Sequence, residues 1–189
     1  MSYNYRKGDI VGTLGYHPIS VAIQWATRSK NEPESFSNHN EIIVNDCDLL
    51  RDVETVAAMG SGVERHKLCE VYAGKRDQVE IWRALNFSDE DRELIADAAI
   101  KHIGHKYPYH RILLQLIDEK IFGGKFVVRR LAFSENFFVC TPLVVHAIWA
   151  ADYRFGFKSP AQANPDNLRD YLQNNPDKYI NIRPLARID

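Results

Sequence analysis

The sequence predicts an α+β domain in which an antiparallel sheet packs against helices. β-rich segments separated by turn residues occupy residues 41–85, a pattern typical of antiparallel strands. Helix signals stand on both sides of this region. Hydrophobic residues make up 45% of the 189 residues, which is enough to bury a substantial core. Because no segment has the length of an interdomain linker, residues 1–189 are expected to form a single domain.

The strands are expected in two groups. A short strand is predicted over residues 8–13, and a helix over residues 18–28 follows, with Pro18 suited to a first helical position. A polar loop then leads into an antiparallel meander. The strands predicted for the meander cover residues 41–44, 51–58, 63–68 and 78–85.

Helices are expected mainly in the second half of the chain. Ser88 with Asp91 three residues later forms a variant of the capping box, and the helix that it opens ends at Gly104. A second helix is predicted over residues 109–122, and a third begins after Thr141-Pro142 and runs through Trp149. Asn164 opens a short helix that reaches residue 172, and residues 179–182 are expected to form a last strand.

Composition excludes several classes of protein. The 24 basic and 25 acidic residues nearly balance, which argues against nucleic-acid binding through a basic face. No stretch approaches the roughly 20 apolar residues of a membrane helix. The N-terminus lacks the apolar core of a secretion signal, so a cytoplasmic location is expected, although a phage-associated or co-exported protein would look the same. The three cysteines have no motif spacing, which argues against a disulfide framework.

Cys140 is the first candidate for chemistry. It precedes Thr141 and Pro142, whose residue types favour the start of a helix. The positive end of a helix stabilises a thiolate, and its unpaired N–H groups can bind the oxyanion of an attacked carbonyl. The alternative is a buried structural cysteine in an apolar segment.

A thiol nucleophile needs a base and an acceptor that orients it. His39 stands where the polar loop enters the predicted strand at residue 41, whereas His146 lies six residues along the helix from Cys140, on its opposite side. Glu54 on the next strand is one candidate for orienting His39. Glu41 is its rival, because it lies two residues from His39 and therefore on the same strand face.

No cofactor is expected. The chain has no phosphate-binding or dinucleotide-binding glycine loop. His102, His105 and His110 could cluster around a metal, but Gly104 interrupts their helix and no acidic residue or cysteine stands at ligand spacing, so a metal site is not predicted. Tyr107 is interpreted as the aromatic wall of a cleft or as core.

The order of several short motifs resembles the circularly permuted NlpC/P60 proteins, the papain-like amidases that include YiiX-like members. The motifs span about residues 8–151 and end on a cysteine at the start of a late helix. They comprise Gly8-Asp9-Ile10-Val11, Asn38-His39-Asn40-Glu41, the strand with Glu54 and Ala57 followed by Gly62-Val63, Val79-Glu80-Ile81-Trp82-Arg83, Gly104-His105-Lys106-Tyr107, and Cys140.

The resemblance implies a papain-like cysteine hydrolase in which the histidine precedes the cysteine. Cys140 would be the nucleophile, His39 the base and Glu54 the orienting acid, with Tyr107 and Glu41 as candidate substrate contacts. The implied substrate is a peptide or acyl amide, such as a peptidoglycan stem peptide. Asn38 and Asn40 around the histidine, and Thr141-Pro142 after the cysteine, depart from the family pattern. A non-catalytic module of a phage or envelope assembly, and a lipid acyl hydrolase or transferase, are the alternatives.

Overall fold

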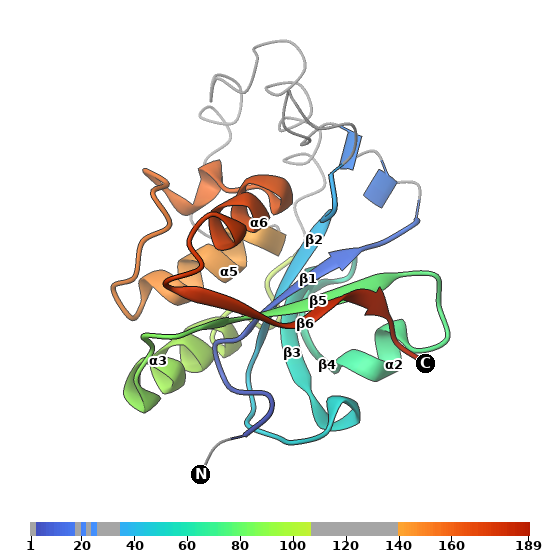
Figure 1. Cartoon of the computed structure of the whole chain (residues 1–189), viewed down its shortest axis with the longest axis horizontal. Coiled ribbons are helices and arrows are strands. Elements are labelled where there is room, and N and C mark those ends of the chain that lie inside the picture. Colours follow the sequence, from blue (N-terminus) through green and yellow to red (C-terminus); the bar gives the residue numbers. More distant parts are fainter. Residues whose placement is uncertain (1–2, 18–19, 22–23, 26–34, 107–139) are drawn as a thin grey trace.

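The computed structural model describes residues 3–17, 20–21, 24–25, 35–106 and 140–189, and its centre is one six-stranded antiparallel sheet (Figure 1). The spatial order of the strands is β4-β3-β2-β1-β5-β6. Their bounds are Ile10–Leu14 (β1), His39–Ile43 (β2), Glu54–Met59 (β3), Gly62–Lys67 (β4), Gln78–Ala84 (β5) and Tyr179–Arg187 (β6). Together with the helices packed on it, this sheet confirms the predicted α+β class.

The predicted meander is correct for three strands and wrong for the fourth. β2, β3 and β4 pair in sequence order, as expected. β5 instead crosses to the far side of β1, where Ile10 faces Trp82. The reason is a short helix that the sequence analysis missed, α2 (Leu68–Tyr72), which follows β4 directly and carries the chain away from the edge of the sheet. β1 and β2 thereby become the central strands.

Helices α3 (Asp89–Ile100), α5 (Cys140–Trp149) and α6 (Pro165–Gln173) gather on one side of the sheet (Figure 1). The capping signals were predicted correctly: Ser88 caps α3 in a reciprocal box with Asp91, and Asn164 caps α6 with Asn167. The helix predicted over residues 109–122, and most of the one predicted over residues 18–28, lie outside the described residues.

The sheet separates two apolar cores. Ile42 faces the core shared with α3, α5 and α6, whereas the next residue, Ile43, faces a second core that includes Leu68 and Tyr72 of α2. Neighbouring residues of a strand point to opposite faces, so β2 contributes to both cores. Adjacent candidate site residues on β2 therefore lie on opposite faces of the sheet.

A buried ionic cluster fixes the segment before β1. The Asp9 carboxylate has no exposed surface and accepts hydrogen bonds from Arg83 of β5 at 2.6 Å and from Arg92 of α3 at 3.1 Å. The side chains of these two arginines are 17% and 4% exposed. Asp9 thus joins the first strand to the helix layer.

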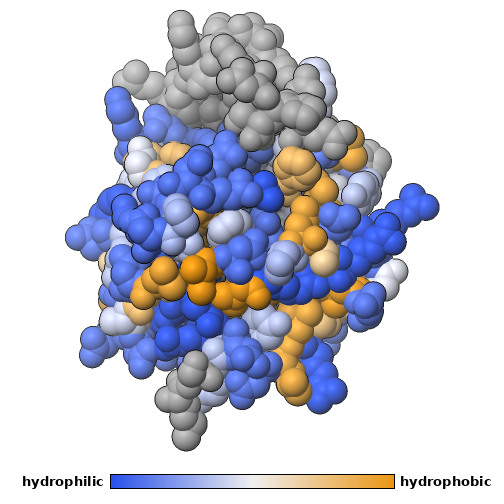
Figure 2. Space-filling model, in the orientation of Figure 1, coloured by the Kyte–Doolittle hydropathy of each residue, from blue (hydrophilic) through white to orange (hydrophobic). Residues whose placement is uncertain are grey.

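The surface is mostly polar. Figure 2 shows hydrophilic side chains over most of one face, with apolar side chains gathered in a few narrow patches. Among the described residues, none of the helices combines the length and the apolar character that a membrane crossing requires.

Candidate active site

Cys140 is the first residue of α5, and its side chain is buried. The neighbouring Thr141 donates a hydrogen bond from Oγ1 to Oδ1 of Asn40 at 2.8 Å. Asn40 belongs to β2, so this bond joins the start of the helix to the strand that carries His39. Residues 101 positions apart in the chain are held together in this way.

His39 is the first residue of β2, and its imidazole lies close enough to the Cys140 thiol for each group to shift the pKa of the other. Its Nε2 lies 3.5 Å from Oε1 of Glu41. The imidazole is therefore placed between a sulfur and a carboxylate. This is the order of groups that a thiol nucleophile, its base and the orienting acid require.

The electrostatics of the pair favour a thiolate and an imidazolium. Burial disfavours the charged imidazole, but the charge of Cys140 and the hydrogen bonds to Cys140 and Glu41 outweigh burial and raise the pKa of His39 to about 10. Burial likewise disfavours the thiolate, yet the charge and hydrogen bond of His39, together with the backbone N–H of Asn40, lower the pKa of Cys140. Each group thus stabilises the charged form of the other.

Glu41 is fully buried and contacts four polar side chains. His39 and the hydroxyl of Tyr72 face its Oε1, whereas Thr55 and His66 face its Oε2. Burial favours the neutral carboxyl, but the hydrogen bonds and charges of the two histidines hold the pKa of Glu41 well below its usual range. Burial and the adjacent carboxylate raise the pKa of Tyr72, so its hydroxyl stays protonated and donates.

The structure does not bring Glu54 to His39. Its carboxylate pairs with Arg65 of β4, and the Glu54 side chain is 29% exposed. The reason is strand alternation: Thr55 points toward Glu41, so its neighbour Glu54 points to the opposite face of β3. Glu41, considered as a substrate contact and as the rival orienting acid, takes the position beside His39. Tyr107, the other candidate substrate contact, lies outside the described residues.

Sequence reasoning missed Thr55, His66 and Tyr72. Each comes from a different element, namely β3, β4 and α2, and each is an ordinary residue of its segment. The pairing of Thr55 with His66 across β3 and β4, and of Thr55 with Ile43 across β3 and β2, brings them near Glu41. Strand register is the signal that would have found Thr55 and His66, whereas Tyr72 depends on the position of α2.

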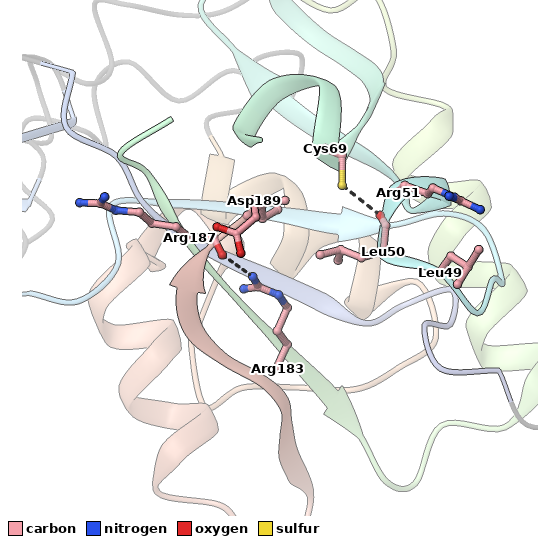
Figure 3. Close-up of a pocket in the computed structure, with 8 residues that line it drawn as sticks. Leu49, Leu50, Arg51, Cys69, Arg183, Arg187 and Asp189 are labelled. Carbon is pink, nitrogen blue, oxygen red and sulfur yellow. Dashed lines mark hydrogen bonds between the residues drawn. The ribbon is translucent and has the colours of Figure 1, made fainter. Parts of the chain in front are cut away.

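A separate surface pocket of about 470 Å³ lies between β6, α2 and the loop before β3 (Figure 3). Its lining includes Cys69, whose thiol donates to the carbonyl of Leu50 at 3.5 Å, and Arg183, whose guanidinium donates to the carbonyl of Arg187. Burial raises the pKa of Cys69, as it does that of Cys47. All three cysteines are free, and among them only Cys140 has a lowered pKa.

Of the three histidines considered for a metal site, His102 and His105 lie among the described residues. His102 lies on the turn after α3, and its Nε2 is 3.3 Å from Nδ1 of His146 on α5, while the rings of His102 and His105 lie 5.3 Å apart. His110 lies outside the described residues. Within the described part of the chain, no three His, Cys, Asp or Glu side chains are arranged to hold a metal ion.

The antiparallel sheet, with a helix that carries Cys140 against the strand that carries His39, fits a papain-like α+β fold. The chain is similar in structure to the metalloprotein yiiX from Escherichia coli O157:H7, with a TM-score of 0.54 and 18% sequence identity. The match covers 98% of this chain and 90% of that one. No protein-family model matches the sequence, and no curated protein matches it either. The fold is thus YiiX-like.

Proposed function

We propose that this protein is a thiol hydrolase of the permuted NlpC/P60 type that cleaves an amide bond, with Cys140 as nucleophile, His39 as base and Glu41 as the orienting acid. The observation that carries the proposal is the placement of the His39 imidazole beside the buried Cys140 thiol, with the fully buried carboxylate of Glu41 3.5 Å from its Nε2. A cysteine that serves only as core has no need of such partners.

In the proposed reaction the Cys140 thiolate attacks the carbonyl carbon, and the start of α5 stabilises the resulting oxyanion. His39 donates its proton to the departing amine as the C–N bond breaks, which leaves a thioester on Cys140. His39 then accepts a proton from water, which attacks the thioester. The thiolate departs, and a carboxylic acid is released.

The substrate class can be tested directly. Peptidoglycan stem peptides are the proposed substrates, and simple peptide amides and lipid acyl esters form the comparison panel. Mass spectrometry is expected to show an amide-derived carboxylic acid with the native protein and none with Cys140→Ala. Turnover of the lipid esters alone would replace the amidase assignment by an acyl hydrolase. The absence of turnover across the panel would favour a binding module.

The thiolate pair gives a prediction that needs no substrate. Between the lowered pKa of Cys140 and the raised pKa of His39, about 10, the ion pair persists, so the alkylation rate of Cys140 with iodoacetamide is expected to level off at a lower pH than the rates of Cys47 and Cys69. Because the pKa values of Cys47 and Cys69 are raised, the alkylation rate of each of these thiols is expected to rise about tenfold with each pH unit between about pH 6 and 8. Labelling rates for each site, read by peptide mass spectrometry, check this.

His39→Ala supplies the control for the labelling. Without the imidazolium, the buried Cys140 thiol is expected to lose the plateau at lower pH and to react like the other two cysteines. If the profile of Cys140 is unchanged by His39→Ala, the dyad is contradicted.

A further inference from the structure

Glu41 divides its two carboxylate oxygens between two histidines. Oε1 lies 3.5 Å from Nε2 of His39, whereas Oε2 lies 3.1 Å from Nε2 of His66. Thr55 also donates to Oε2, at 2.5 Å, and Tyr72 donates to Oε1. The side chain of Glu41 has no exposed surface, so these buried contacts orient its two oxygens.

His66 reaches the carboxylate from two strands away. It lies on β4, the edge strand, where its partner across the ladder is Thr55 of β3. Thr55 in turn pairs with Ile43 of β2. Ile43 lies two residues after Glu41, so the two residues share one face of that strand. The side chain of His66 is only 11% exposed. An edge-strand histidine would normally be able to face solvent, yet this ring turns inward to a buried charge.

The hydrogen-bonding state of His66 follows from its two nitrogens. Nε2 faces the carboxylate, while the buried Nδ1 has no hydrogen-bond partner within the described part of the chain. A proton on Nε2 lets His66 donate to Oε2, whether or not Nδ1 also carries one.

We propose that His66 is a positioning residue of the thiol site: it holds Oε2 of Glu41 so that Oε1 stays directed at His39. The proposal rests on the proposed function and deepens it, because His66 acts through Glu41 rather than on the reacting atoms. Without His66, Oε2 keeps the hydroxyl of Thr55 as a donor but loses its second one, so the carboxylate is held less firmly and the imidazolium of His39 loses part of its support. The thiolate of Cys140 then becomes less stable.

The test compares two substitutions that differ in one hydrogen bond. His66→Leu removes the donor, and His66→Gln can place an amide N–H close to the position of Nε2. With His66→Leu, the rise of the Cys140 alkylation rate is expected to move to higher pH, and kcat is expected to fall about 10- to 100-fold with a small change in KM, the usual effect of losing a hydrogen bond to a charged group. With His66→Gln, the alkylation rate of Cys140 and kcat are both expected to stay within about threefold of the native values.

Arg65→Gln serves as the matched control, because Arg65 is the neighbour of His66 on β4 and pairs with Glu54 instead. Circular dichroism establishes that each variant is folded, and His66→Met replaces His66→Leu if the latter unfolds. The proposal is overturned if folded His66→Leu or His66→Met keeps the native alkylation profile of Cys140. It is also overturned if His66→Gln shows the same loss as His66→Leu. Labelling needs no turnover, so a shifted profile supports the role of His66 even if no amide substrate is cleaved.

Discussion

Replacing Glu41 with glutamine is expected to lower kcat of the proposed hydrolysis by about 10²- to 10⁴-fold, the range typical of losing an aligned general base. The amide keeps the size of the side chain but removes the negative charge beside His39. The NH₂ group of the amide also replaces one acceptor oxygen, so either Thr55, which donates to Oε2, or Tyr72, which donates to Oε1, then faces a donor. Steady-state kinetics with an active amide substrate measure the effect.

Glu54→Gln makes the matched control for this prediction. It removes the same charge from the neighbouring strand β3, where the carboxylate pairs with Arg65 near the surface. A partly exposed pair contributes little, so kcat is expected to change by less than about twofold. A larger loss with Glu54→Gln than with Glu41→Gln would return the orienting role to Glu54, the acid that the family resemblance implied.

The second large effect concerns stability. Asp9→Ala is expected to reduce the free energy of unfolding by about 3–5 kcal/mol, because it leaves the buried guanidinium of Arg92 and the partly buried one of Arg83 without their shared carboxylate. Urea unfolding followed by circular dichroism measures the loss. The alkylation profile of Cys140 in the folded variant is expected to stay native, since Asp9 is outside the cysteine site.

Asp89→Ala is the control for the stability prediction. Asp89 also pairs with an arginine, Arg6, but its side chain is 89% exposed. An exposed ion pair is screened by water, so a much smaller loss of stability is expected. Equal losses for Asp9→Ala and Asp89→Ala would mean that burial is not the source of the effect.

Local signals in the sequence were sufficient for much of the fold. The capping residues Ser88 and Asn164 predicted the starts of α3 and α6, because a side-chain cap satisfies backbone N–H groups within three residues of itself. The strands β2, β3 and β4 were predicted for the same reason, since alternation and turns are short-range patterns. The position of β5 beside β1 was not predicted, because strand neighbours far apart in the chain leave no local signal.

The candidate site shows the same division. Residue type and local context singled out Cys140 and His39, and the period of two along a strand made Glu41 a rival to Glu54. The choice between the two acids required the side-chain directions on β3, where Thr55 takes the position facing Glu41. His66 and Tyr72 had no distinguishing feature until register and the turn of α2 placed them against the same carboxylate.

The sequence by itself therefore determined the α+β class, the helix caps and the thiol and imidazole that could react. Only the tertiary structure decided which carboxylate supports the imidazole and which second histidine supports that carboxylate. The physical reason is range: caps and strand alternation act over two to four residues, whereas the charge state of a buried group depends on every side chain packed around it.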